Sequence, residues 1–189
     1  TMQQGIDFQG VTFAYPESDR IALSAFDMHI PAGKTVAIVG ENGAGKSTLL
    51  KLICRLYDPQ AGAVTWDGVD LRQLAVAELR RRITVLFQQP IAYHETVADN
   101  IHLGDIGAQP TLAEIEEAAR KGGAASIVEK LPKGYDTVLG KWFGYTDLSV
   151  GEWQRVALSR AFLRQAELVI LDEPTSAMDS WAEHAWMAN

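Results

Sequence analysis

The sequence lacks the features that would place the chain outside the cell, within a bilayer or on a nucleic acid. One cysteine, Cys54, occurs among 189 residues, so no internal disulfide can form and a reducing compartment is expected. No apolar run approaches the roughly 20 residues that a bilayer-spanning helix needs. With 24 acidic and 17 basic residues the net charge is -7, which argues against a nucleic-acid partner, because such proteins gather Lys and Arg. We expect one globular unit whose membrane role, if it has one, runs through another segment or subunit.

Histidine and clustered positive charge are also scarce. The four histidines show no metal-ligand spacing, so a site built from protein histidines is not expected. The only basic cluster, Arg80–Arg82, is interpreted as the solvated end of a helix. Cys54 follows an apolar helical run and is interpreted as a small buried hydrophobe.

A glycine-rich loop is the most informative motif that is present. Residues 40–47 read GENGAGKS and stand between the apolar run Thr35–Val39, predicted to be a strand, and the helix-like run Thr48–Ile53. The glycines let successive amides turn toward an anion, and the helix directs its positive end to the same point. Lys46 can reach outer phosphates and the Ser47 hydroxyl can ligate magnesium. A mere glycine turn is a weak alternative.

Strand-like segments surround this loop. Residues 6–16 and 26–30 alternate apolar and polar side chains, which predicts half-buried strands ahead of the loop. Residues 63–70 predict a hairpin that turns at Asp67-Gly68. Residues 83–87 and 168–171 are apolar runs suited to buried parallel strands.

The stretch between about residues 91 and 147 is helical in character. Thr111 and Glu114 stand at capping-box spacing and open an Ala- and Glu-rich helix that stops at Gly122-Gly123. We interpret the stretch as a helical insertion in an α/β core.

A pair of acids, Asp172-Glu173, ends the strand-like run at 168–171. Asp172 is suited to hold the water shell of magnesium, and Glu173 to orient and deprotonate an attacking water. Combined with the glycine-rich loop, the pair predicts nucleotide hydrolysis.

A second phosphate-binding helix end is predicted at residues 148–152, LSVGE. Ser149 and Glu152 stand at capping-box spacing, so a helix should begin here with free amides around Gly151. Such an end attracts phosphate. A plain capped helix is an equal alternative on these residues alone.

Taken in order and spacing, residues 40–47, 148–152, 172–175 and 176–179 resemble the nucleotide-binding domain of ABC transporters. The resemblance implies that Tyr15 stacks on adenine and that Gln88 touches magnesium and senses the transmembrane partner. It implies a catalytic set of Glu173, Gln88 and Lys46 and a magnesium set of Ser47, Gln88 and Asp172. The implied nucleotide contacts are Tyr15, Gly40, Asn42, Gly43, Ala44, Gly45, Lys46, Ser47, Thr48 and Gln88, with Ser149, Gly151 and Asp179 acting across a dimer seam.

The fold implied by the resemblance is an α/β P-loop NTPase core, mainly a parallel sheet flanked by helices, with an N-terminal antiparallel β layer. Residues 1–90 and 160–189 would form the β layer and core, and 91–159 a helical subdomain. In this family ATP and Mg²⁺ are held between two head-to-tail domains. The segments 88–104 and 134–140 are most similar to exporters.

The implied function is therefore an ATP-hydrolysing motor domain on the cytoplasmic face of a membrane, coupled to the transmembrane domain of an exporter. Two alternatives stay open: an ATP-gated binding module with little hydrolysis, and a soluble ABC ATPase uncoupled from transport.

The sequence departs from the family pattern at several positions. Val150 and Glu152 stand where the family usually has glycine and glutamine, and Lys141 follows Gly140 where exporters commonly have glutamate. The strand and switch histidine expected after Asp179 are absent, and His184 follows too soon to be that histidine. We therefore expect a domain truncated at its C-terminus.

Overall fold

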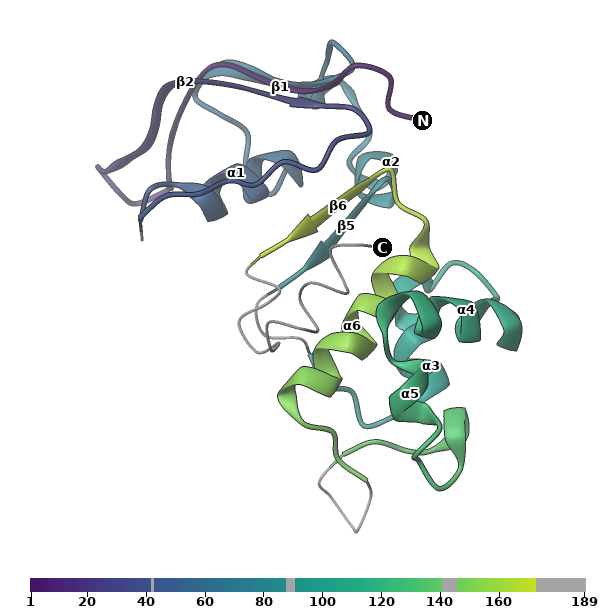
Figure 1. Ribbon diagram of the computed structural model, residues 1–189. Helices are drawn as coiled ribbons and strands as arrows, with labels where there is room; N and C mark the ends of the chain where they lie inside the picture. Colours follow the sequence, from purple (N-terminus) through teal and green to yellow (C-terminus); the bar gives the residue numbers. More distant parts are fainter. Residues whose placement is uncertain (42, 88–90, 141–145, 173–189) are drawn as a thin grey trace. The chain divides into compact units, whose positions relative to one another are not determined.

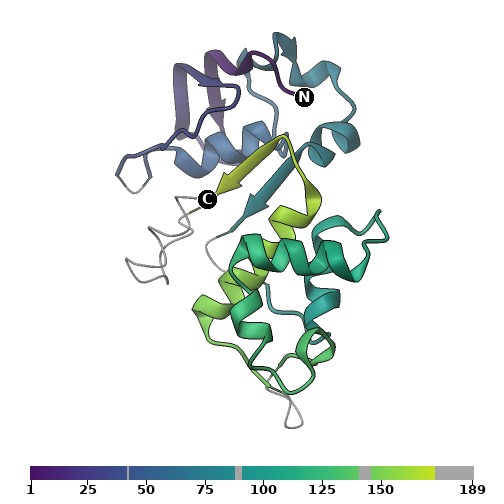
Figure 2. The ribbon, with the colours of Figure 1, turned by 45° about the vertical axis from the view of Figure 1, so that its right-hand side comes forward.

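The computed structural model describes residues 1–41, 43–87, 91–140 and 146–172. The chain divides into two compact units, Thr1–Ile83 and Thr84–Asn189, and each is described by itself (Figures 1 and 2). Among the helices in the described ranges, none combines the length and apolarity that a membrane span requires.

The first unit is built on an antiparallel sheet with the strand order β2-β1-β3-β4. Its strands are β1 (Gly5–Ala14), β2 (Ile21–Pro31), β3 (Ala61–Trp66) and β4 (Val69–Asp70). Alternate side chains of β1 are buried on either side of a register shift, Ile6 and Phe8 before it and Val11 and Phe13 after it, as half-buried strands require. The predicted antiparallel β layer is confirmed.

The predicted hairpin at Asp67-Gly68 is also confirmed. Both residues have positive φ, 50° and 79°, the backbone of a tight two-residue turn between β3 and β4. The Asp67 carboxylate also accepts hydrogen bonds from the backbone N–H groups of Gln3, Gln4 and Gly5. The turn therefore fixes the start of β1 as well.

Helices α1 (Lys46–Ile53) and α2 (Val76–Arg81) and the short 3₁₀ helix η1 (Leu71–Gln73) complete this unit. Both views show α1 running beneath the strands of the unit (Figures 1 and 2). Arg80, exposed as predicted for the basic cluster, donates to the carbonyls of Cys54 and Arg55 and so ties α2 to the end of α1.

Cys54 is less buried than predicted. It is half-buried rather than buried, because it caps the C-terminus of α1 instead of lying on its apolar face. Burial still raises the pKa of its thiol, against the opposing effect of the Arg80 charge. Its thiol is therefore neutral at physiological pH.

The predicted strand at Thr35–Val39 does not form. These residues have no regular secondary structure, and Val36, Ile38 and Val39 are 42%, 37% and 88% exposed. A strand exists only where its amides and carbonyls pair with a neighbour, and no strand of the described ranges pairs with this run. An apolar, β-branched sequence is therefore not sufficient by itself to form a strand at these residues.

The second unit contains the two strands predicted from apolar runs. β5 (Ile83–Leu86), which starts at the unit boundary, and β6 (Leu168–Leu171) form a two-stranded sheet and point the same way (Figure 1). The backbone N–H of Asp172 donates to the Leu86 carbonyl at 2.9 Å. Asp172 is therefore held at the carboxyl end of the sheet.

The described residues between β5 and β6 are largely helical, as predicted for the stretch between about residues 91 and 147. The helices are α3 (Val97–His102), η2 (Leu103–Asp105), α4 (Leu112–Gly122), α5 (Ala125–Val128), η3 (Gly134–Asp136) and α6 (Val150–Arg164). The capping box of Thr111 and Glu114 is present, and Gly123 ends α4 in the left-handed conformation.

A hydrophobic core joins these helices around α6. It includes Val97, Ile101, Leu139, Trp153 and Val156. α4 and α6 approach closely at Gly122, where an added Cβ would lie 2.6 Å from the backbone nitrogen of Ser159. The helix that begins at Ser149 is thus the central element of this unit.

Candidate nucleotide-binding site

The phosphate loop is shaped by glycines that take positive φ. Gly43 and Gly45 have φ of 85° and 92°, a region that other residues adopt only with strain. A Cβ at Gly45 would also lie 3.0 Å from Leu23 Cδ2 and 3.1 Å from the Ala22 carbonyl oxygen. The loop is therefore packed against the start of β2 so tightly that glycine is required.

The N-terminus of α1 is open to an anion. Gly45 is its N-cap, no side chain makes a capping hydrogen bond, and no acidic residue lies in the first turn. The first amides of a helix lack intrahelical acceptors and carry the positive end of the helix dipole. A phosphate placed here would meet donors and favourable charge.

Lys46 and Ser47 are the first two residues of α1. The Lys46 ammonium donates to the carbonyl of Gly40 at 2.6 Å and to that of Glu41 at 3.0 Å, so the side chain folds back over the loop. Ser47 is exposed. Asn42, also predicted to contact the nucleotide, lies outside the described residues.

Tyr15 connects to this helix through Thr48. The Tyr15 hydroxyl and Thr48 Oγ1 share a hydrogen bond of 2.9 Å, and Thr48 is buried. The Lys51 ammonium lies 4.8 Å from the centre of the Tyr15 ring, and Phe13 and Tyr57 pack against the ring edge-on. The predicted base-stacking residue is thus fixed to the first turn of α1, directly after the phosphate loop, with a cation over its ring.

The residues predicted to act with magnesium are divided between the units. Ser47 belongs to the first unit and Asp172, at the end of β6, to the second. Gln88, Glu173 and Asp179 lie outside the described residues. Within the described ranges no three or more His, Cys, Asp or Glu side chains cluster as a metal site.

The predicted capping box at Ser149 is present. Glu152 Oε2 accepts from both the backbone N–H and the hydroxyl of Ser149, each at 2.8 Å. These two hydrogen bonds hold the pKa of the Glu152 carboxyl below its usual value. The Ser149 hydroxyl proton is therefore engaged by a carboxylate that stays ionised at neutral pH.

A buried polar network was missed by the sequence reasoning. Asn100 is fully buried and donates to the carbonyls of Tyr93, Glu95 and Thr96, while its side-chain oxygen accepts from Arg160 at 2.7 Å. The network ties the segment after Gln88 to the helix that begins at Ser149. No local signal marks it, because its partners lie 60 residues apart.

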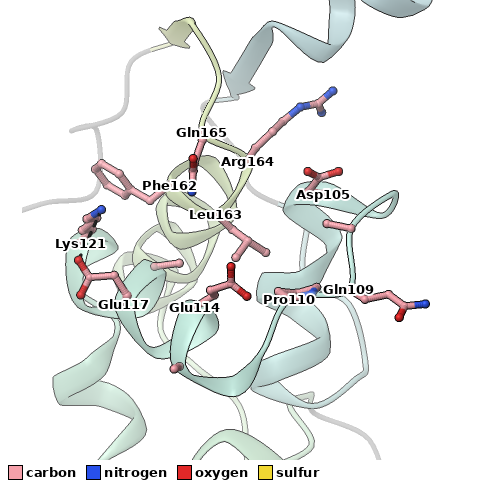
Figure 3. Close-up of a pocket in the computed structure, with 13 residues that line it drawn as sticks. Asp105, Gln109, Pro110, Glu114, Glu117, Lys121, Phe162, Leu163, Arg164 and Gln165 are labelled. Carbon is pink, nitrogen blue, oxygen red and sulfur yellow. Dashed lines mark ion pairs between the residues drawn. The ribbon is translucent and has the colours of Figure 1, made fainter.

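A pocket of about 440 Å³ lies in the second unit between α4, η2 and the end of α6 (Figure 3). Figure 3 shows Glu114, Glu117, Lys121 and Arg164 around it. None of its lining residues is among those predicted to bind nucleotide. Glu114 Oε2 caps Thr111, from which it accepts two hydrogen bonds of 2.8 Å.

Comparison with known proteins agrees with the loop geometry. The model of the family described as ABC transporter matches residues 23–176. The chain belongs to the ABC transporter family. Proteins named ATP-dependent lipid A-core flippase are 43% identical over 183 residues in Vibrio cholerae and Escherichia coli K12 and 42% identical over 178 residues in Alkalilimnicola ehrlichii. The matches cover 94–97% of this chain but 30–31% of the relatives.

A solved structure extends the family likeness to three dimensions. A bacterial Atm1-family ABC exporter with ATP bound superposes with a TM-score of 0.89 at 35% identity, over 98% of this chain and 32% of that one. The predicted fold class, an ABC ATPase domain of α/β type with an antiparallel β layer, is confirmed. Like its curated relatives, the solved exporter is about three times as long as this ABC domain.

Proposed function

We propose that this chain is the ATP-binding and ATP-hydrolysing domain of an ABC exporter. The observation that carries the proposal is the loop of residues 40–48 in a chain of this family. Its glycines turn the backbone around the uncapped start of α1, and the Lys46 ammonium lies across the loop on two carbonyls. Phosphate oxygens are stronger acceptors for that ammonium than neutral carbonyls, so a nucleotide would draw it outward.

Each predicted site residue has a role in this proposal. The loop amides and Lys46 bind the outer phosphates and Tyr15 supports the base. Ser47, Gln88 and Asp172 would hold Mg²⁺, whose charge offsets that of the phosphates during transfer. The exposed Ser47 hydroxyl and the Asp172 carboxylate are hard oxygen ligands, which Mg²⁺ prefers. Glu173 would orient and deprotonate the attacking water.

The partners belong to the proposal as well. Two such domains would close head to tail, with Ser149, Gly151 and Asp179 of one meeting the nucleotide of the other. Residues 1–90 and 160–189 would form the β layer and core, and 91–159 the helical subdomain. Since the relatives are named flippases and are about three times as long, a transmembrane domain would couple closure to export on the cytoplasmic side of a membrane.

One observation favours a second candidate function, an ATP-gated clamp with little hydrolysis. The Ser149 hydroxyl donates to Glu152 at 2.8 Å, and a carboxylate beside a phosphate-binding helix end opposes a polyanionic ligand. Weak closure of the dimer would leave ATP bound but slowly hydrolysed. The two functions predict different rates of ATP hydrolysis, whereas both predict ATP binding.

Phosphate release by the purified protein tests both. For the motor, we expect Mg²⁺-dependent turnover that Glu173→Gln abolishes while ATP binding persists, and Lys46→Ala loses binding itself. ATP binding without phosphate release in the wild type would support the clamp instead. Failure of the wild type to bind ATP with Mg²⁺ would refute both.

A further inference from the structure

The segment that joins Tyr15 to β2 passes beside the phosphate loop. Its last residue, Arg20, directly precedes β2, and a Cβ added at Gly43 would lie 3.9 Å from Arg20 Nη2. Three residues further on, Leu23 contacts Gly45. The guanidinium of Arg20 therefore reaches the middle glycine of the loop, a few residues before Lys46.

The charge of Arg20 is uncompensated within the described residues. Three other arginines pair with carboxylates: Arg55 with Asp58, Arg72 with Asp70 and Arg120 with Glu117. The side chain of Arg20 is exposed, and across the described ranges it makes no ion pair; its backbone N–H donates to Ser18 Oγ at 3.3 Å. An arginine that faces a phosphate loop without a carboxylate is free to bind an anion there.

We propose that Arg20 is a second cationic contact for the polyphosphate of the nucleotide. This inference rests on the proposed function. A guanidinium presents several N–H donors in one plane and binds phosphate oxygens through two of them at once. The Lys46 ammonium carries a single positive charge and three donors, so the Arg20 guanidinium would add a second charge and further donors for a polyanionic ligand.

The same short segment would then hold both ends of the ligand. Tyr15 begins it and is fixed to Thr48 by its hydroxyl, and Arg20 ends it beside Gly43. Base and phosphates would be bound by one connection between two strands. Arg20 therefore discriminates nucleotides by their phosphates, whereas Tyr15 contributes to all ligands that carry the base.

Calorimetric binding of ATP, ADP and adenosine to the purified protein tests the assignment, with Arg20→Ala, Arg20→Lys and the control Arg81→Ala. Arg81 is an exposed arginine on α2, so its removal makes the same change in net charge. We expect Arg20→Ala to weaken the binding of ATP and of ADP by about tenfold, as loss of a charge-assisted hydrogen bond does. The affinity for adenosine and the melting temperature should not change. Arg20→Lys should recover part of the loss, and Arg81→Ala should match the wild type.

Each contrary outcome is distinct. Binding of ATP by Arg20→Ala within twofold of Arg81→Ala overturns the assignment and leaves the proposed function standing. An equal loss for adenosine would put Arg20 at the base and also overturn it. Failure of the wild type to bind ATP overturns the proposed function, and this assignment with it.

Discussion

The pair of Asn100 and Arg160 should be strongly coupled in the stability of the second unit. Asn100 is 0% exposed, and its amide reaches three backbone carbonyls at 3.0–3.2 Å. Arg160 donates to the backbone and side-chain oxygens of Asn100 and to the carbonyl of Ile91. Truncation of Asn100 removes four side-chain hydrogen bonds, and truncation of Arg160 removes three. The bond between Asn100 Oδ1 and the Arg160 guanidinium is common to both sets.

The size of the effect follows from the number of hydrogen bonds that each variant loses. Each hydrogen bond contributes about 0.5–1.5 kcal/mol net, so loss of the four side-chain bonds of Asn100 should lower the free energy of unfolding of Asn100→Ala by about 3 kcal/mol. Arg160→Met keeps much of the aliphatic stem and should cost about 2 kcal/mol. Since both remove the bond between Asn100 Oδ1 and the Arg160 guanidinium, the double variant should cost about 1–2 kcal/mol less than the sum.

Urea unfolding followed by circular dichroism measures all three variants. Arg120→Met is the control, because its ion pair with Glu117 is on the surface of α4 and such pairs contribute about 0–1 kcal/mol. A loss below about 1 kcal/mol for Asn100→Ala, or strict additivity in the double variant, would refute the reasoning that this network binds the segment after Gln88 to α6.

Three further outcomes are expected. Gly122→Ala should destabilise the protein by about 1–3 kcal/mol, because the added Cβ would lie 2.6 Å from the Ser159 nitrogen. Gly107→Ala is the control, since its Cβ would meet only the Asp105 side chain, at 3.7 Å. Equal urea midpoints for the two variants would contradict this prediction. Because the pKa of Glu152 is lowered in the folded protein, the stability that its carboxylate adds is complete above the ordinary glutamate pKa of about 4.3 and is lost as pH falls through the folded-state pKa. Between pH 7 and 3 the melting temperature of Glu152→Gln should therefore fall less than that of the wild type. Parallel curves for the two proteins would refute the capping role. At neutral pH, Glu152→Gln should tighten ATP-driven dimerisation by about fivefold through removal of like charge, measured by analytical ultracentrifugation; an unchanged dimer yield would show that the carboxylate does not oppose the ligand.

Sequence by itself determined the parts of this protein that depend on neighbouring residues. The capping boxes at Thr111 and Ser149 and the turn at Asp67-Gly68 were predicted and are present. Each is closed by hydrogen bonds or backbone angles within a few residues, so a short window holds all the information. The order of the phosphate loop, the Ser149 segment and the acids at Asp172 was sufficient to predict the family.

Tertiary structure decided whatever depends on partners distant in the chain. Thr35–Val39 has a strand-like sequence but forms no strand, because a strand is stabilised by its neighbour and not by its own pattern. The hydrogen bond of Tyr15 to Thr48 and the approach of Arg20 to Gly43 join residues more than twenty positions apart. Such contacts arise only when the chain folds back on itself, and no local spacing encodes them.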